Sequence, residues 1–141
     1  EQAVVKLQSQ LQGKRCYLFR IEHHFGIGGK PDVLALAPTA DVFEVILWVG
    51  TNANGLAYKG KELTTLGIIA WLKQHVQEQP FQITGVGMDF IEGRYLAPVK
   101  DPLRLAKEMY EFCPDIVDQG TGTVEKLAEE LKQGKLFFWW D

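Results

Sequence analysis

The stretch TVEKLAEELKQGKLFFWWD, residues 123–141, carries a helix signal and a strand signal on the two sides of one glycine. Its apolar residues first recur at helical spacing and predict one buried helix face: Val124, Leu127, Ala128 and Leu131. Gly134 ends this helix, and KLFFWWD follows as a strand that is apolar on both faces. A helix followed directly by such a strand is typical of α/β proteins.

The same signals predict further helices earlier in the chain. Asp41 has N-cap chemistry, and Gly50 stands where a left-handed C-terminal residue belongs, so the segment between them is predicted to be a short helix. Asp101 and Pro102 begin another helix in the favoured order of cap and first-turn proline. The predicted helices of this part of the chain span residues 2–12, 42–49, 65–78 and 102–113.

Strand signals alternate with these helices. RCYLFRIE (residues 15–22) alternates, DVLALAP (32–38) is apolar at nearly every position and is predicted to lie centrally in a sheet, and FQITGVGMDFI (81–91) shifts its alternation at Gly85, which suggests a bulge. The glycine-rich segment after residue 22 is predicted to be a connection. The sequence therefore predicts one α/β domain over residues 1–141, with a mixed sheet of four to five strands and helices on both faces.

Composition and charge narrow the classes of function. The chain is 46% hydrophobic, carries a formal net charge of −3 and has two cysteines, Cys16 and Cys113, far apart in sequence. A basic face for nucleic acid or anionic membrane is not expected. No apolar run approaches the roughly 20 residues that span a bilayer, and residues 1–13 lack the basic start and the apolar core of a signal peptide. We therefore expect a cytoplasmic protein with reduced thiols.

The turn before the last helix is the first candidate site. Asp115 and Asp118 precede Gly120, Thr121, Gly122 and Thr123. The favoured interpretation is structural: Asp118 accepts from the free amides of the helix and Thr121 or Thr123 caps it, a contact worth ~1 kcal/mol. Alternatively, the free amides bind an anion, with the glycines allowing close approach. The two aspartates oppose a bare phosphate, unless a divalent metal such as Mg²⁺ bridges them. Otherwise no cofactor is expected.

Two further groups of residues are candidates. Asp89, Glu92 and Arg94 lie near a strand end, where α/β sheets place ligands. A surface ion pair between Glu92 and Arg94 is favoured over a pair of carboxylates that act as acid and base. Trp139 and Trp140 point to opposite faces of their strand. Both are expected to fill the core, although one of them in an exposed apolar patch would meet a partner protein.

Several of these stretches also identify a family. The ordered set DVLALAPT, WVGTNANG before IIAWL, GVGMDFIEG, FCPDIVDQGTGTVEKLAEEL and the terminal LFFWWD resembles a bacterial domain of unknown function, the family numbered 4253. The resemblance covers about residues 32–141 and leaves out residues 1–31, the N-terminal helix, strand and glycine-rich connection. The stretch AYKGKE is longer than the resemblance implies. The family brings no established activity and no catalytic residues.

No residue pattern in the chain identifies a reaction. We therefore expect a non-catalytic protein-interaction or regulatory module, of toxin-neutralising type among others, with a protein partner. The alternative is an enzyme or binding protein for a phosphorylated or otherwise anionic small molecule, with a divalent metal held by carboxylates.

Overall fold

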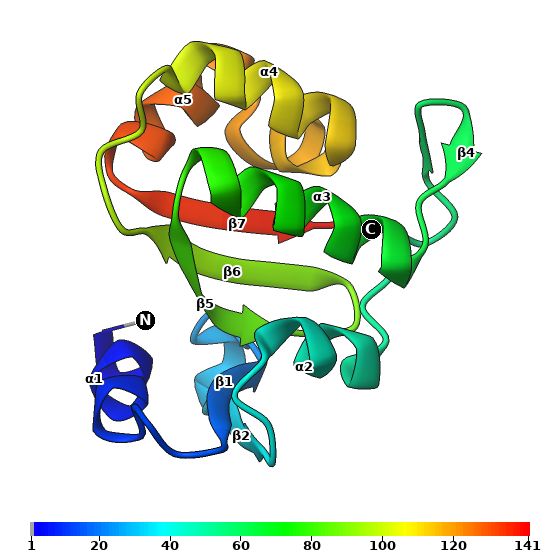
Figure 1. Cartoon of the computed structure of the whole chain (residues 1–141). Coiled ribbons are helices and arrows are strands. Elements are labelled where there is room, and N and C mark those ends of the chain that lie inside the picture. Colours follow the sequence, from blue (N-terminus) through cyan, green and yellow to red (C-terminus); the bar gives the residue numbers. More distant parts are fainter. Residues whose placement is uncertain (1) are drawn as a thin grey trace.

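A five-stranded mixed sheet in the order β2-β1-β5-β6-β7 runs through the protein (Figure 1). In this computed structural model, which describes residues 2–141, β1 and β5 are parallel and the other neighbours are antiparallel. The strands of this sheet are β1 (Tyr17–Glu22), β2 (Val33–Ala37), β5 (Phe81–Val86), β6 (Phe90–Tyr95) and β7 (Lys135–Trp139). A small separate hairpin is formed by β3 (Ala57–Tyr58) and β4 (Lys61–Glu62). The predicted single α/β domain with a mixed sheet is thus confirmed.

Helices cover both faces of the sheet. On one face lie α2 (Val42–Val49), α3 (Thr65–Glu78), α4 (Pro102–Phe112), a π-helix (Ile116–Thr121) and α5 (Val124–Lys132) (Figure 1). On the opposite face lies α1 (Gln2–Gln10), where the Gln8 side chain accepts a hydrogen bond from the Gln82 side chain. The neighbours of Gln82 on β5, Phe81 and Ile83, are buried on the other face of the sheet. None of the helices in residues 2–141 has the length and apolar composition needed to cross a membrane.

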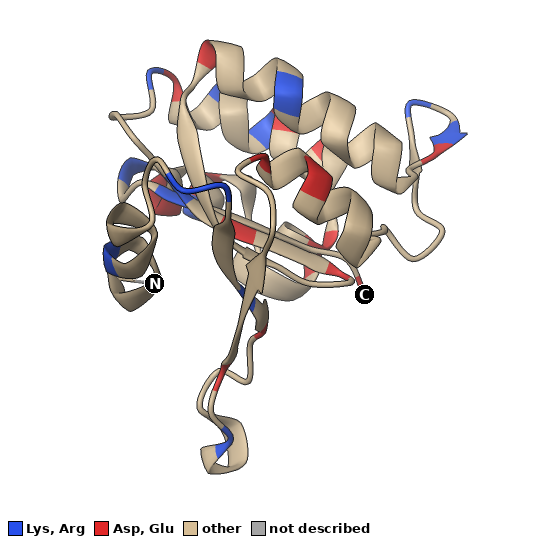
Figure 2. Ribbon diagram, turned by 60° about the horizontal axis from the view of Figure 1, so that its bottom comes forward, with Lys and Arg blue, Asp and Glu red and all other residues tan. Residues whose placement is uncertain are grey.

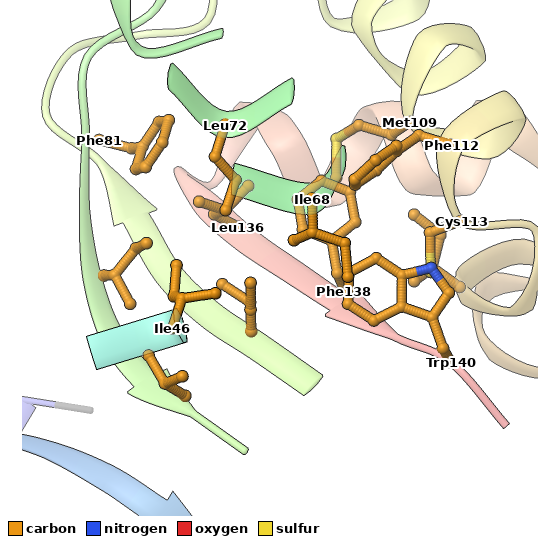
Figure 3. Close-up of a cluster of buried hydrophobic side chains, with 14 of the residues drawn as sticks. Ile46, Ile68, Leu72, Phe81, Met109, Phe112, Cys113, Leu136, Phe138 and Trp140 are labelled. Atoms are coloured by element: carbon orange, nitrogen blue, oxygen red, sulfur yellow. The ribbon is translucent and has the colours of Figure 1, made fainter. Parts of the chain in front are cut away.

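The main core fills the space between the sheet and helices α2 to α5. Aromatic rings from α3, α4 and β7 meet there: Phe112 stacks on Trp71 with ring centroids 4.4 Å apart, and packs edge-on against Phe138 and Trp140. Figure 3 shows Phe112 of α4 meeting Phe138 and Trp140 of the C-terminal stretch, with Trp140 beside Phe138. The C-terminal stretch thereby anchors one end of the sheet to α4.

The helix predictions are confirmed wherever local chemistry carried them. The Asp41 side chain accepts from the Phe43 amide at 2.8 Å, and Gly50 adopts a left-handed φ of 73° at the end of α2. Thr64 caps α3 and Asp101 caps α4. A helix cap involves residues only a few positions apart, so these helix ends can be predicted from the sequence alone.

Two strand predictions are wrong. The stretch DVLALAP does not lie centrally: β2 is an edge strand that pairs with β1 alone, and Val33, Leu34 and Leu36 are exposed. The stretch 81–91 is not one strand either, because it turns at residues 87–89 into the antiparallel β6. Both depend on which strands pair, which an apolar pattern does not specify. The predicted bulge at Gly85 is confirmed by a register shift between Ile83 and Gly85.

The main core also contains one buried polar pair, His75 of α3 and Tyr95 of β6. The Nε2 atom of His75 lies 3.0 Å from the Tyr95 hydroxyl, and the imidazole stacks on Trp71 with centroids 4.7 Å apart. Burial disfavours the charged imidazolium and lowers the pKa of His75 from 6.5 to about 4. The folded protein therefore holds this side chain neutral.

This burial predicts a loss of stability in mild acid. The unfolded chain takes up a proton at His75 near pH 6.5, whereas the folded protein does so only near pH 4. The neutral, buried state of His75 therefore contributes to the free energy of unfolding in full above pH 6.5. This contribution, on the order of 2 kcal/mol, is lost as the pH falls from 6.5 to about 4. Urea unfolding at pH 7.5 and pH 4.5 should show a smaller loss for His75→Gln than for the wild type. Equal losses would contradict this account.

Candidate functional site

The parallel strands β1 and β5 part at their carboxyl ends. Their register places Arg20 beside Gly85. Past that point β1 continues along β2, whereas β5 enters the turn at residues 87–89 and returns as β6. Ligands of α/β proteins commonly bind at the carboxyl ends of strands that separate in this way.

An open pocket of about 810 Å³ lies at this end of the sheet, and we call it the aromatic pocket. It is lined from β1, the loop of residues 23–32, α2, the β5–β6 turn, β6 and β7. Figure 2 shows that the 23–32 loop projects beyond the body of the domain. The aromatic lining residues are Phe19, Phe25, Trp48, Phe90, Phe137 and Trp139.

The β5–β6 turn on one side of the pocket is held firmly. Each of its three consecutive carbonyl groups, at residues 87–89, accepts a hydrogen bond from a residue distant in sequence. The donors, in order, are the Thr51 hydroxyl at 2.7 Å, the Asn52 amide at 2.8 Å and the Trp140 amide at 2.9 Å. The side chains of Met88 and Asp89 therefore stand on a fixed backbone at the pocket.

A buried ion pair lies where the strands part. Arg20 of β1 donates from Nη1 to Oε1 of Glu92 on β6 at 2.6 Å, and the two side chains are only 9% and 11% exposed. Arg20 also places Nε 3.1 Å from Oδ2 of Asp32, just before β2. One guanidinium thus joins three segments of the sheet, and its positive charge faces two carboxylates.

His23 extends this cluster towards the pocket. Its Nδ1 lies 3.1 Å from Oε2 of Glu92, and its ring stacks on Phe25 with centroids 3.8 Å apart. The His24 amide donates to Asp32 at 2.9 Å, and this bond, helped by the charge of Arg20, lowers the pKa of Asp32. The carboxylate of Asp32 is therefore ionised at neutral pH, and the base of the 23–32 loop is tied to the sheet.

Two glycines make room for this arrangement. A Cβ atom at Gly85 would lie 2.5 Å from Oε1 of Glu92, and one at Gly87 would overlap the ring of Phe90. Glu92 and Phe90 belong to the neighbouring strand and lie across these two positions. The missing side chains of the Gly-Val-Gly stretch therefore provide the space in which the ion pair and one aromatic wall are placed.

The predicted cluster of Asp89, Glu92 and Arg94 is only partly brought together. Asp89 lines the pocket, and Glu92 lies in the ion pair beside it. The predicted surface pair of Glu92 with Arg94 is wrong: Glu92 bonds Arg20, and Arg94 donates to Gln82 at 3.0 Å. The partner of Glu92 is 72 residues away in sequence, beyond the reach of any local pattern.

The two adjacent tryptophans have different surroundings. Trp140 is fully buried against Phe112 and Phe138, as expected for a core residue. Trp139 is only half-buried and lines the aromatic pocket. The alternating directions of side chains on a strand account for the difference.

The Gly-Thr-Gly-Thr turn uses its polar groups internally. The Thr123 hydroxyl accepts from the Lys126 amide and caps α5, as predicted, while the Thr121 hydroxyl donates to the Thr123 carbonyl. Gly120 lies in the π-helix, and Gly122 has a left-handed φ of 80° directly after it. Residues 116–123 thus form a compact connection from α4 to α5.

The aspartates of this turn have different partners from those expected. Asp118 accepts from the Tyr110 hydroxyl at 3.0 Å instead of from the amides of α5. Asp115 accepts from the side chain of Gln119 at 3.2 Å and from the Asp141 amide at 3.0 Å. The carboxylates therefore tie the turn to α4 and to the C-terminal residue.

Cys113 lies in the core next to this turn. Its thiol donates to the Trp139 carbonyl at 3.0 Å, and burial raises its pKa to about 12. A thiol with this pKa is almost entirely protonated at neutral pH and is a poor nucleophile. Within residues 2–141, no three His, Cys, Asp or Glu side chains gather in a way that would hold a metal ion.

Sequence reasoning missed most of the residues around the pocket. The sequence predicts a helix around Trp48 but no role for this residue, and no local pattern connects Arg20, His23 or Asp32 with Glu92. Two signals were present: a charged residue within the apolar strand YLFRIE, and glycines spaced two apart in Gly-Val-Gly. The charged residue indicates a buried pair and the glycines indicate a close approach of another chain segment, but neither signal predicts which residue is the partner.

Residues 33–141 match the profile of Domain of unknown function (DUF4253), and the chain belongs to this family. The match covers about three-quarters of the chain, and it includes Trp48, Asp89, Glu92 and Trp139. Comparisons with curated proteins and with solved structures gave no match.

The space at Gly85 predicts the effect of a single methyl group. In Gly85→Ala, the new Cβ displaces a Glu92 side chain that Arg20 and His23 hold in place, so the ion pair must break. We expect a loss of about 3 kcal/mol in the free energy of unfolding. Gly120→Ala is the matched control, because its Cβ would meet only one backbone atom, at 3.7 Å. Equal urea midpoints for the two variants would contradict this account.

Proposed function

We propose that this domain is a non-catalytic protein-interaction module and that the aromatic pocket receives an apolar segment of its partner. The open pocket of about 810 Å³ with six aromatic lining residues is the observation that carries the proposal. Aromatic side chains are enriched at protein interfaces and supply much of the binding energy there. A regulatory or toxin-neutralising role would use the same surface.

The rim of the pocket favours a macromolecular partner. Trp48, Met88 and Phe25 are 58%, 67% and 64% exposed, and all three contribute to the lining. They present apolar surface outside the pocket as well as within it, which a small enclosed ligand would leave in water. A partner that covers both the pocket and its rim would remove this surface from water.

The chemistry of the surrounding groups supports binding more than catalysis. The two carboxylate oxygens of Glu92 already contact Arg20 and His23, and Glu92 is not part of the pocket lining. Cys113, the buried thiol, points at the Trp139 carbonyl and is protonated at neutral pH. The side chains that do face the pocket are mostly apolar, and they are suited to recognition.

The alternative, a site for an anionic small molecule with a carboxylate-bound metal, has less support. Asp115 and Asp118 already accept hydrogen bonds from Gln119, Tyr110 and the Asp141 amide. A metal ion would have to compete with these donors for the same oxygens. This function remains the second candidate.

A neutral peptide tests the proposal. We choose acetyl-Ser-Leu-citrulline-Leu-Ser-amide, which offers apolar side chains and no charge, and measure binding from the amide chemical shifts of the protein. We expect shifts at residues around the pocket and an affinity about tenfold lower in Trp48→Ala. Leu66→Ala is the control, because Leu66 is also exposed and lies on α3, outside the pocket lining.

The proposal would be contradicted by either of two results. One is that the peptide leaves the pocket resonances unchanged at millimolar concentration, and the other is that it binds Trp48→Ala and the wild type equally well. Because Trp48 is more than half exposed, its truncation should leave the fold intact, and a thermal melt verifies this.

A further inference from the structure

We infer that the partner segment brings a cationic side chain, arginine in particular, into the aromatic pocket. This inference rests on the proposed function and adds the chemistry of the ligand. The charges around the pocket, the aromatic faces in its wall and the fixed backbone that carries Asp89 support it.

The charges around the pocket are predominantly negative. Glu22 and Asp89 line it together with the imidazoles of His23 and His24, and among residues 2–141 no lysine or arginine belongs to the lining. Behind the wall, the single charge of Arg20 faces both Glu92 at 2.6 Å and Asp32 at 3.1 Å. With a neutral imidazole at His23, whose Nδ1 lies 3.1 Å from Glu92, this cluster carries one negative charge in excess. The low dielectric of the apolar wall screens this charge less than water would. A cation is therefore attracted to the pocket, and an anion is repelled.

The aromatic wall suits the same ligand. The face of an indole or phenyl ring carries partial negative charge and attracts a guanidinium or ammonium group within about 6 Å of its centroid. Trp48 of α2 and Trp139 of β7 both line the pocket. The aliphatic stem of an arginine side chain would pack on apolar residues, and its planar head can stack on an indole while donating to a carboxylate.

The carboxylate of Asp89 is well placed to receive such a donor. Its own carbonyl is bonded to the Trp140 amide at 2.9 Å, and the preceding carbonyl, at Met88, to the Asn52 amide at 2.8 Å. The backbone that carries Asp89 is thus fixed before any ligand binds, so little conformational entropy is lost on binding. Glu22, at the end of β1, also lines the pocket, and its Oε2 atom lies 3.2 Å from Nε2 of His24. A cation in the pocket would therefore meet the carboxylate of Asp89 and the His24-bound carboxylate of Glu22 in its lining.

Matched peptides test the charge separately from the apolar contact. Arginine replaces citrulline in the same sequence, acetyl-Ser-Leu-arginine-Leu-Ser-amide, which changes a urea group to a guanidinium of nearly the same shape. We expect the arginine peptide to bind the wild type at least tenfold more tightly than the citrulline peptide. Raising the salt from 50 to 500 mM NaCl should reduce this advantage.

Variants of the protein locate the carboxylates responsible. Asp89→Asn and Glu22→Gln should each reduce the arginine advantage, the ratio of the two peptide affinities measured in the same variant, at least threefold. Glu125→Gln removes one exposed carboxylate from α5, outside the pocket lining, and should leave the advantage intact.

Each contrary result overturns a distinct part of the inference. If citrulline and arginine peptides bind equally and both depend on Trp48, the cationic partner is wrong and the apolar interaction module stands. If neither peptide binds, both proposals fail. If butylguanidinium alone binds as tightly as the arginine peptide, the site belongs to a small cationic molecule, and the protein partner is wrong.

Discussion

The buried ion pair between Arg20 and Glu92 is the constraint on which the functional end of this fold depends. It connects β1 to β6 across β5, and it fits only because Gly85 has no side chain. Removing one member of a buried pair leaves an unpaired charge in a poorly solvated place, which typically costs 3–5 kcal/mol. The pair therefore holds three strands in one arrangement at the point where β1 and β5 separate.

The aromatic pocket follows from that separation. Once β1 turns away with β2, its last residues and the β5–β6 turn stand apart, and aromatic side chains from α2, β6 and β7 line the space. The turn stays in place because all three of its carbonyls are hydrogen-bonded. An open apolar surface on such a rigid frame is costly to leave in water, and a partner would relieve that cost.

Local signals predicted more of the fold than of the site. The helices at 42–49 and 65–78 were predicted because caps and apolar spacing act within one or two turns, and the bulge at Gly85 because the strand alternation shifts there. The edge position of β2 and the return of β6 along β5 were missed, since strand pairing is decided by distant parts of the chain. Arg20 and Glu92 are 72 residues apart in sequence, so a local pattern can mark each residue as unusual but cannot predict that the two form an ion pair.

A thermodynamic double-mutant cycle tests the central claim most directly. It compares urea unfolding of the wild type, Arg20→Met, Glu92→Leu and the double variant. If the pair sets the arrangement of the strands, each single variant loses about 3 kcal/mol, and the double variant loses at least 2 kcal/mol less than their sum. Losses that add to within about 0.5 kcal/mol would contradict the account, because the two residues would then act independently.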